Sequence, residues 1–310
     1  MKTVMNEDDW IDRIVARLPV YARPRSGSGG LVLGIGDDAA IYRPAPGEDL
    51  VFTTDMMHEE RHFLRRYPPD SVGWKALCRG LSDIAAMGAQ PRFALLSLAV
   101  APWVKTAWID GFYDGFLALA AKYRVPLAGG DLGRAAHTAI DVVVCGSLPA
   151  GSALRRNTAS AGDRLYMSGM LGGGILGLRS PLNRAARERH LRPEPRITLG
   201  LALRRRGIAS AAMDLSDGLS SDVARLARAS GLAAQLRQPL PAFPGASESD
   251  TLHGGDDYEI LFAAPPSVRV PSRLAATPVH PVGELVEGAP GRLFFEGEPL
   301  RPAGWDHFAK

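Results

Sequence analysis

Aspartate stands beside glycine, serine or threonine in six short segments of this 310-residue chain. Its carboxylate is short and anionic, and glycine lets backbone N–H groups approach an anion closely. Mg²⁺ takes such oxygen ligands and usually shares them with substrate phosphates. A single segment is most simply a turn, because Asp and Gly are ordinary turn residues. All six together predict one site where several Mg²⁺ ions hold a polyphosphate. The segments are Gly36-Asp37-Asp38, Thr53-Thr54-Asp55, Ser82-Asp83, Gly129-Gly130-Asp131, Asp214-Leu215-Ser216-Asp217-Gly218 and Gly254-Gly255-Asp256-Asp257.

We expect each segment to lie where a strand or helix ends, so that the element positions the carboxylate. Apolar residues at helical spacing predict helices from a cap at Asn6 to Leu18, from a cap at Ser71 to about Met87, from Trp103 to Tyr123 and from Leu219 to Gly231. Apolar and β-branched runs predict strands at Leu31–Leu33, Val51–Thr54, Phe93–Val100, Ile140–Ser147, Leu165–Ser168, Ala211–Leu215, Glu259–Ala263 and Arg292–Phe295. The second of these strands is expected to stop at Asp55.

A polar stretch of small residues from Pro149 to Gly162 divides the chain into two predicted domains, residues 1–148 and 149–310. Strands and helices interleave irregularly, and several neighbouring strands could be antiparallel. This pattern favours an α+β or mixed α/β fold over a uniform doubly wound sheet.

The composition is that of a soluble globular protein. Net charge is +3, and the basic residues are scattered apart from Arg204-Arg205-Arg206, so a nucleic-acid partner is not favoured. Two mid-chain cysteines indicate a reduced compartment. The first 18 residues lack the apolar core of a signal peptide, and the longest mostly apolar run, Phe93 to Trp103, is too short to span a membrane. We expect a cytoplasmic protein with no membrane partner.

Two segments match motifs of other chemistries. His58 to His62 fits H-E-x-x-H, which binds zinc when a helix presents both histidines on one face, but here a strand precedes it and Pro68-Pro69 follows. Gly172 to Gly177 fits G-x-G-x-x-G, but no second strand with an acidic end follows, as a dinucleotide site requires. We expect these glycines to permit close helix packing or to line a phosphate. No P-loop motif occurs.

Charged residues near two of the Asp segments have both structural and functional interpretations. Lys75, Arg79 and Asp83 share one helix face, either as an exposed ion-pair ladder or as part of a cation site at the helix C-terminus. Ser216 or Asp217 could simply cap the following helix, or could also bind phosphate there. Three carboxylates between residues 256 and 259 are costly unless cations or a cationic ligand neutralise them.

Taken in chain order, the motifs resemble those of the thiamine-monophosphate kinase family, within the aminoimidazole-ribonucleotide-synthetase-like ATP-binding superfamily. The resemblance spans nearly the whole chain. It rests on Gly34 to Ala40, Thr53-Thr54-Asp55, Leu81 to Ala89, Gly129-Gly130-Asp131, Asp214 to Gly218, Gly255 to Glu259 and the ending Trp305-Asp306-His307-Phe308.

The resemblance implies ATP-dependent phosphorylation of thiamine monophosphate to thiamine diphosphate, the last step in making that product. It also implies a homodimer in which residues 1–148 bind ATP and Mg²⁺ and form a β-barrel across subunits, while residues 149–310 complete an active site between the domains. Several Mg²⁺ ions are implied, and the need for a monovalent cation stays open. The implied metal ligands are Asp38, Thr53, Thr54, Asp55, Asp83, Asp131, Asp214 and Asp217.

The same resemblance implies ATP contacts at Gly130, Asp131, Arg156 and Ser216, and thiamine contacts at His62, Asp256 and Trp305. Asp131, Arg156 and Asp217 are the implied catalytic residues. The chain departs from the family at Asp256, where glutamate is more usual, at Leu132, where a small polar residue is usual, and at Arg61 before His62.

Three alternatives remain at this stage. Another kinase or synthetase of the superfamily is one, although selenophosphate synthetase uses an N-terminal Cys or selenocysteine and hydrogenase-maturation relatives use a C-terminal Cys, and this chain has neither. A zinc hydrolase using His58 and His62 is the second. A non-catalytic nucleotide-binding regulator is the third, and it predicts ATP binding without turnover.

Overall fold

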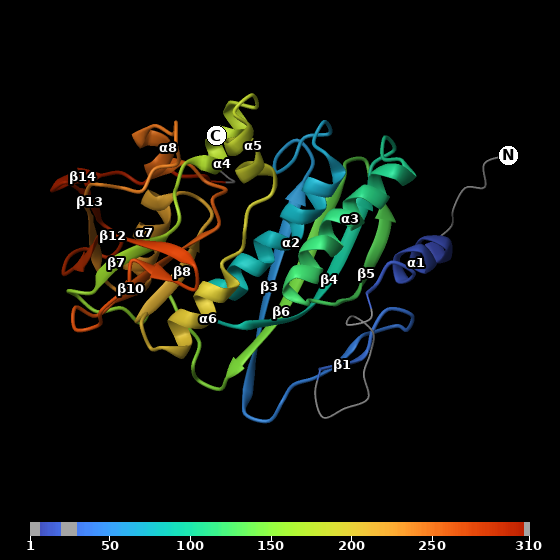
Figure 1. The fold of residues 1–310 in the computed structure, drawn as a ribbon, viewed down its shortest axis with the longest axis horizontal. Coiled ribbons are helices and arrows are strands. Elements are labelled where there is room, and N and C mark those ends of the chain that lie inside the picture. The colour runs from blue at the N-terminus through green and yellow to red at the C-terminus, as the bar shows by residue number, and fades with distance from the viewer. Residues whose placement is uncertain (1–6, 20–29, 307–310) are drawn as a thin grey trace. The chain divides into compact units, whose positions relative to one another are not determined.

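The computed structural model describes residues 7–19 and 30–306, and the chain forms two compact units. Unit 1 comprises Met1–Ile84 and Gln90–Ala150, and unit 2 comprises Ala85–Ala89 and Gly151–Lys310. Both contain helices and strands (Figure 1), as expected for a mixed α/β protein. The predicted cap at Asn6 and the C-terminal His307 and Phe308 lie outside the described residues.

Unit 1 is built on a four-stranded sheet with the order β3-β6-β4-β5. Its strand β5 runs parallel to β4, and the other pairs are antiparallel. A separate hairpin pairs β1 with β2. The elements of this part of the chain are α1 (Glu7–Val15), β1 (Gly30–Leu33), β2 (Ile41–Arg43), β3 (Glu48–His58), α2 (Pro69–Ala86), β4 (Gln90–Val100), α3 (Thr106–Tyr123), β5 (Leu127–Arg134) and β6 (Ala139–Pro149).

Helices α2 and α3 lie along one face of this sheet (Figure 1). Phe112, Phe116 and Leu119 of α3 are fully buried, as the apolar spacing of the predicted helix requires. The two helices approach closely at Gly115, where a Cβ atom would lie 1.7 Å from the carbonyl oxygen of Asp70. Burial of these aromatic and aliphatic side chains therefore fixes α2, and with it the polar residues on its sheet-facing side.

Two predicted strand ends are wrong. Strand β3 does not stop at Asp55 but continues to His58, and β5 runs through Gly129-Gly130-Asp131 to Arg134. In each case the ladder continues across the motif, with Asp55 opposite Val142 and Asp131 opposite Ser97. Tertiary pairing outweighs the low strand propensity of Asp and Gly, on what are the two edge strands of the sheet. Helix α2 also begins earlier than predicted, because Pro69 fits a first helical turn.

Unit 2 is built on a second sheet with the strand order β14-β13-β9-β12-β7-β10-β8, and β11 pairs with β12. Only β13 and β9 are parallel among these pairs of described strands. The elements are β7 (Arg164–Ser168), α4 (Gly173–Arg179), α5 (Arg184–Leu191), α6 (Ile197–Arg205), β8 (Ala211–Leu215), α7 (Leu219–Ala229), β9 (Ala233–Leu236), α8 (Glu248–His253), β10 (Glu259–Ala264), β11 (Arg273–Leu274), β12 (Thr277–Val286), β13 (Leu293–Phe295) and β14 (Glu298–Leu300).

The core of unit 2 forms between α7 and this sheet. Leu219, Val223 and Leu226 of α7 share one buried cluster with Met213 of β8 and Leu261 of β10. The apolar stripe predicted for α7 is thus confirmed, and the antiparallel neighbours exclude a uniform doubly wound sheet. Strand β12 was not predicted, because Pro278 and Pro281 suggested turns.

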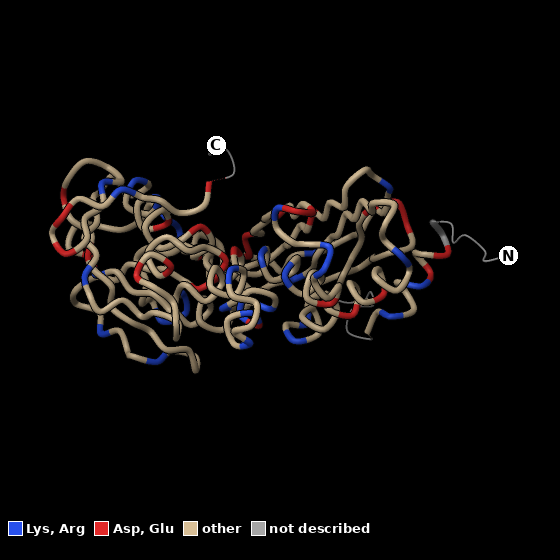
Figure 2. Tube along the Cα trace, turned by 90° about the horizontal axis from the view of Figure 1, so that it is seen from above, with Lys and Arg blue, Asp and Glu red and all other residues tan. Residues whose placement is uncertain are grey.

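Three properties of the described residues bear on the setting and partners of the chain. None of the helices in the described part is both long and apolar enough to cross a membrane. Lys and Arg positions are distributed through both units, often near Asp and Glu (Figure 2). Both cysteines, Cys78 and Cys145, are buried and form no disulfide.

Candidate functional site

Three predicted metal ligands of unit 1 meet on the helix-facing side of the sheet. Thr53 and Asp55 share this side of β3, because alternate residues of a strand point to the same face. Thr53 Oγ1 lies 2.5 Å from Asp83 Oδ2 at the end of α2, and Arg79 Nη2 donates to Asp55 Oδ1 at 3.0 Å. The segments around residues 53–55 and 82–83 therefore form one polar cluster, although they are far apart in the chain.

Thr54 lies on the opposite face of β3. Its Oγ1 lies 2.7 Å from Asp141 Oδ1 on the neighbouring strand β6. The structure therefore separates the Thr54 side chain from those of Thr53 and Asp55.

The exposed-ladder interpretation of Lys75, Arg79 and Asp83 is wrong. Lys75 is only 2% exposed, and both Arg79 and Asp83 contact residues of β3. Arg79 and Asp83 thus belong to the polar cluster, and Lys75 is buried in unit 1.

A pocket of about 980 Å³ in unit 1 joins two further Asp segments. Both Gly36-Asp37-Asp38 and Gly129-Gly130-Asp131 line it, over apolar residues that include Tyr42 and Phe93. Asp37, Asp38 and Asp131 are all exposed, so their oxygens can reach a ligand. At Gly130 a Cβ would lie 1.9 Å from the carbonyl oxygen of Leu96, and the φ of +154° favours glycine. Any residue with a side chain at position 130 would therefore prevent β5 from approaching β4 this closely.

The H-E-x-x-H segment is not helical. Strand β3 ends at His58, and a turn follows in which the His58 backbone N–H donates to His62 Nδ1 at 3.0 Å. Since Nδ1 accepts this bond, neutral His62 carries its proton on Nε2. The two histidines therefore do not share a helical face, and the geometry behind the zinc signature is absent.

Glu59, the glutamate of that segment, is buried and fully engaged by the protein. It accepts from the Thr138 backbone N–H at 2.7 Å, from Trp103 Nε1 at 3.0 Å and from Arg65. Burial opposes ionisation, but the combined effect of these donors is larger and lowers the pKa of Glu59 to about 2. Glu59 therefore anchors the loop that carries His62, and it is not placed as a general base.

In unit 2 three predicted site residues lie close together in the chain: Asp214 in β8, and Ser216 and Asp217 in the turn between β8 and α7. The backbone N–H groups of Ser216 and Asp217 both donate to Asp222 Oδ2 at 3.1 Å. Burial, followed by the nearby charge of Asp217, raises the pKa of Asp222 to about 6. Arg225 donates to both Asp217 and Asp222, and so ties the two carboxylates together.

The loop before β10 lies directly against this turn. Asp256 N donates to the carbonyl oxygen of Ser216, and Tyr258 N to that of Leu215, both at 2.8 Å. The backbone N–H of Trp305 donates to the carbonyl oxygen of Asp217, also at 2.8 Å, and the Trp305 side chain is about half exposed. Unit 2 thus brings together Ser216, Asp217, Asp256 and Trp305.

Arg156 lies elsewhere in unit 2. Its carbonyl oxygen accepts from Ser230 Oγ at 2.8 Å, at the C-terminal end of α7, whereas Ser216 and Asp217 precede the N-terminal end. Its side chain is exposed. Asp214, by contrast, is buried at the end of β8.

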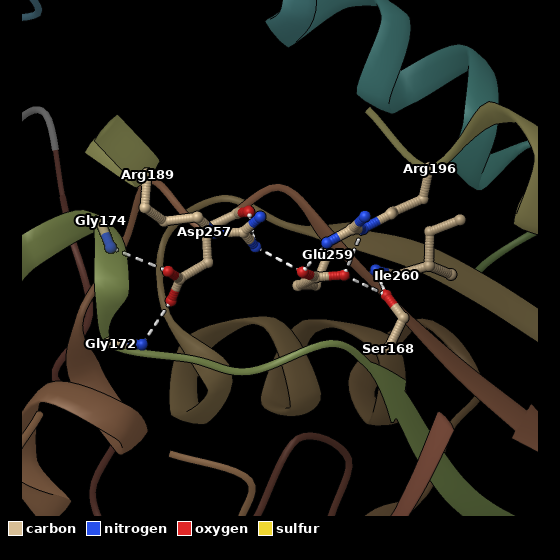
Figure 3. A network of polar contacts seen from close by, with 8 residues as sticks. All are labelled: Ser168, Gly172, Gly174, Arg189, Arg196, Asp257, Glu259 and Ile260. Atoms are coloured by element: carbon tan, nitrogen blue, oxygen red, sulfur yellow. Dashed lines mark hydrogen bonds and ion pairs between the residues drawn. The ribbon is translucent and has the colours of Figure 1, made fainter. Parts of the chain in front are cut away.

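Two of the three carboxylates at residues 256–259 are satisfied by the protein itself, Glu259 by cations and Asp257 by backbone N–H groups. Glu259 is fully buried and binds Arg189, Arg196 and Ser168 (Figure 3). Burial opposes its ionisation, but the two guanidinium groups keep its pKa below the usual value. The third carboxylate, Asp256, is the one that stays partly exposed.

Asp257 explains the glycine motif of unit 2. Its carboxylate accepts from the backbone N–H groups of Gly172 at 2.6 Å and Gly174 at 2.9 Å (Figure 3). The N-terminus of α4 is therefore occupied by a side chain of the same chain, where a phosphate would otherwise bind. Strand β7 has antiparallel neighbours, so a dinucleotide-binding unit is excluded.

The donors present are carboxylate and hydroxyl oxygens, which suit Mg²⁺. In the described ranges, no group of three or more His, Cys, Asp or Glu side chains is arranged to hold a metal ion by itself. Mg²⁺ is commonly held by one or two carboxylates together with water and substrate phosphates, and such a site does not require a preformed group of three.

Sequence reasoning missed Asp222, Arg225 and Tyr258. Asp222 and Arg225 lie three residues apart on the expected helix α7, and that spacing was the available signal. Tyr258 offered no signal, because its contact with Asp256 depends on a left-handed backbone at both residues.

Comparison with known proteins identifies relatives along nearly the whole chain. Residues 36–148 match the family described as AIR synthase related protein, N-terminal domain, and residues 160–295 match AIR synthase related protein, C-terminal domain. A protein named thiamine-monophosphate kinase from Escherichia coli (strain K12) is 36% identical over 315 residues, which cover 93% of this chain and 96% of the relative.

Two solved structures extend the likeness to the fold. The crystal structure of thiamine-monophosphate kinase from Stenotrophomonas maltophilia K279a matches with a TM-score of 0.79 and 34% identity, over 94% of this chain and 96% of that one. AaThiL complexed with AMPPCP and TMP matches with a TM-score of 0.78 and 28% identity, over 99% of this chain and 100% of that one.

Proposed function

This chain belongs to the thiamine-monophosphate kinase family, and we propose that it transfers the γ-phosphoryl group of ATP to thiamine monophosphate, giving thiamine diphosphate and ADP. The observation that carries this proposal is 36% identity to a protein of that name across 93% of the chain. The solved complex of a relative with AMPPCP and TMP supports the same pair of substrates. A reduced, cytoplasmic setting agrees with two buried cysteines that form no disulfide.

The proposed Mg²⁺ ligands are Asp38, Thr53, Thr54, Asp55, Asp83, Asp131, Asp214 and Asp217. Bound Mg²⁺ would neutralise the phosphates of both substrates. In unit 1, the exposed carboxylates of Asp38 and Asp131 face one pocket, and Asp83 lies beside Thr53. In unit 2, Asp217 is partly exposed beside Arg225. The Thr54 side chain faces away from Thr53, so we propose that Thr54 contributes to the metal site through its backbone.

Transfer is proposed to be direct, with the acceptor phosphate attacking the γ-phosphorus in line. The acceptor phosphate is already anionic at neutral pH, so the reaction needs alignment and charge neutralisation more than a strong base. Gly130, Asp131, Arg156 and Ser216 are the proposed ATP contacts. Asp131, Arg156 and Asp217 are the proposed catalytic residues, with Arg156 supplying positive charge to the phosphates.

His62, Asp256 and Trp305 are the proposed contacts for the thiamine moiety. An anionic and aromatic environment suits a cationic thiazolium ring through charge attraction and cation–π contact. His62 carries its proton on Nε2, because its Nδ1 accepts the backbone bond of His58.

We further propose a homodimer in which the sheet of unit 1 completes a β-barrel with that of a second copy. The edge strand β3 supports this, because Leu50, Phe52 and Met56 project from one of its faces and are 36%, 60% and 52% exposed. An exposed apolar row on a long edge strand is typical of an interaction surface. Light scattering should give twice the chain mass, and a Phe52→Asp variant should shift toward the monomer. A monomeric wild type would contradict this part of the proposal.

The experiment that tests the function is a coupled assay of ADP release with Mg²⁺-ATP. Thiamine monophosphate should support turnover, and free thiamine should not, because it lacks the phosphate that attacks. ATP binding without turnover on any thiamine phosphate would favour a non-catalytic regulator. Trp305→Ala should weaken acceptor binding by roughly 1–2 kcal/mol while ATP binding changes little. Equal turnover of thiamine and its monophosphate would contradict the assignment.

A further inference from the structure

The loop from Gly254 to Tyr258 has an unusual backbone. Asp256 has a φ of +68° and Tyr258 a φ of +52°, so two non-glycine residues separated by one position both lie in the left-handed region. Each such residue costs on the order of 1–3 kcal/mol, and it persists only where surrounding contacts hold it. The loop is therefore held in this shape by something other than its own preference.

The contacts that hold the loop come from both sides. On one side, the N–H groups of Asp256 and Tyr258 donate to carbonyl oxygens of the turn that carries Ser216 and Asp217. On the other side, the Asp257 carboxylate binds the N-terminus of α4, and Arg189 Nη2 donates to the Asp257 carbonyl oxygen at 2.8 Å (Figure 3). These contacts stabilise the two left-handed residues.

The result is a particular direction for the Asp256 side chain. Tyr258 Oη donates to Asp256 Oδ1 at 2.8 Å, and His190 Nδ1 lies 3.7 Å from Asp256 Oδ2. Tyr258 is 3% exposed and His190 is also buried, whereas a third of the Asp256 side chain is exposed. A buried hydroxyl therefore orients a carboxylate that is open to solvent beside Ser216 and Asp217.

We propose that Tyr258 is a positioning residue for acceptor binding, which fixes the Asp256 carboxylate in the orientation that receives the cationic ring of the acceptor. This inference rests on the proposed function of Asp256. The left-handed backbone at residues 256 and 258 contributes to this orientation, because it turns the Tyr258 hydroxyl back toward Asp256, only two positions earlier.

The test is Tyr258→Phe, which removes one hydroxyl and keeps the buried ring. The matched control is Tyr166→Phe, also in unit 2, whose ring stacks on Phe262. Initial rates and calorimetric titration with thiamine monophosphate are measured for both. We expect Tyr258→Phe to raise the acceptor KM and Kd about tenfold, the size of a lost hydrogen bond to a charged group. The KM for ATP should change little, the melting temperature should fall by only a few degrees through the lost hydrogen bond, and the control should behave as wild type.

A double-mutant cycle separates positioning from a general effect on stability. In an Asp256→Ala background, Tyr258→Phe should change acceptor affinity less than about twofold, because no carboxylate remains to be oriented. An equal effect in both backgrounds, or an unchanged acceptor Kd in Tyr258→Phe alone, would overturn the inference and leave the proposed kinase function intact. A wild-type protein that neither binds nor phosphorylates thiamine monophosphate would overturn both.

Discussion

The tripeptide Gly-Asp-Asp occurs twice in this chain, at residues 36–38 in unit 1 and 255–257 in unit 2, with opposite consequences. In the first copy both carboxylates are exposed, and Asp37 Oδ1 accepts only the backbone N–H of its neighbour Asp38 among the contacts described. In the second, Asp257 is 1% exposed and both its oxygens bind the N-terminus of α4. Only Asp256 keeps an exposed fraction there.

The comparison of the two copies indicates which carboxylates are available to a ligand. Oxygens already satisfied by donors of the protein stabilise the fold, because removing those donors would leave a buried charge. Exposed oxygens beside glycine can still bind a cation or a cationic group. An acidic motif in a sequence is therefore a candidate site only where the fold leaves its oxygens accessible.

The largest expected effect is a loss of stability in the Glu259→Gln variant. Glu259 lies two residues after the second tripeptide. The change leaves Arg189 and Arg196 without their buried counter-charge, and breaking such a pair costs about 3–5 kcal/mol. Denaturant unfolding of the variant and the wild type measures this loss. Arg237→Gln is the control, since its partner Glu284 is exposed and that pair should contribute at most about 1 kcal/mol. A Glu259→Gln protein as stable as wild type would remove the distinction between the two tripeptides.

The next effect concerns activity, from Asp38→Asn in the first tripeptide. Because Asp38 is exposed, the unfolding free energy of the Asp38→Asn variant should stay within about 0.5 kcal/mol of the wild-type value. If Asp38 binds Mg²⁺ in the reaction, kcat should fall by roughly 100-fold or more, as for loss of a group that stabilises transition-state charge. Rates at saturating Mg²⁺ and ATP check this. Near-normal turnover would show that an exposed Gly-Asp-Asp turn is only a turn.

The smallest effect is the pH dependence that Asp257 contributes. Burial raises its pKa to about 6, against partial opposition from Arg189 and the two glycine N–H groups. A carboxyl group with a raised folded-state pKa contributes stability that is fully present below its unfolded pKa and is lost as pH rises through about 6.

Lowering the pH from 7 to 5 should therefore add about 1 kcal/mol to the unfolding free energy through Asp257. Asp257→Asn should lack this increment. Asp222, whose pKa is also raised to about 6, contributes with the same sign, and so the comparison is made between slopes of wild type and variant. Identical slopes would mean that Asp257 titrates as an ordinary exposed aspartate.

Much of the fold could be predicted from local patterns. The apolar stripe of α7, the buried residues of α3 and the valine-rich strand β6 all lie where their periodicity indicates, because burial of one face is what that periodicity encodes. The patterns failed at Asp55, at Gly129-Gly130-Asp131 and at β12, where strand pairing continues through residues that usually end a strand. Pairing energy comes from neighbouring strands and is not visible in a short window of sequence.

The types and order of the residues were enough to indicate the family and the proposed chemistry of Asp-rich phosphoryl transfer. Which carboxylates remain accessible depends on contacts that form only in the folded chain. Asp257 is satisfied by Gly172 and Gly174, which precede it by 85 and 83 positions, and Glu259 by Arg196, 63 positions away. The two Gly-Asp-Asp segments thus differ in the exposure of their carboxylates, because hydrogen-bond donors from distant parts of the chain contact only the second. The residues next to the motif in the sequence do not reveal such distant partners.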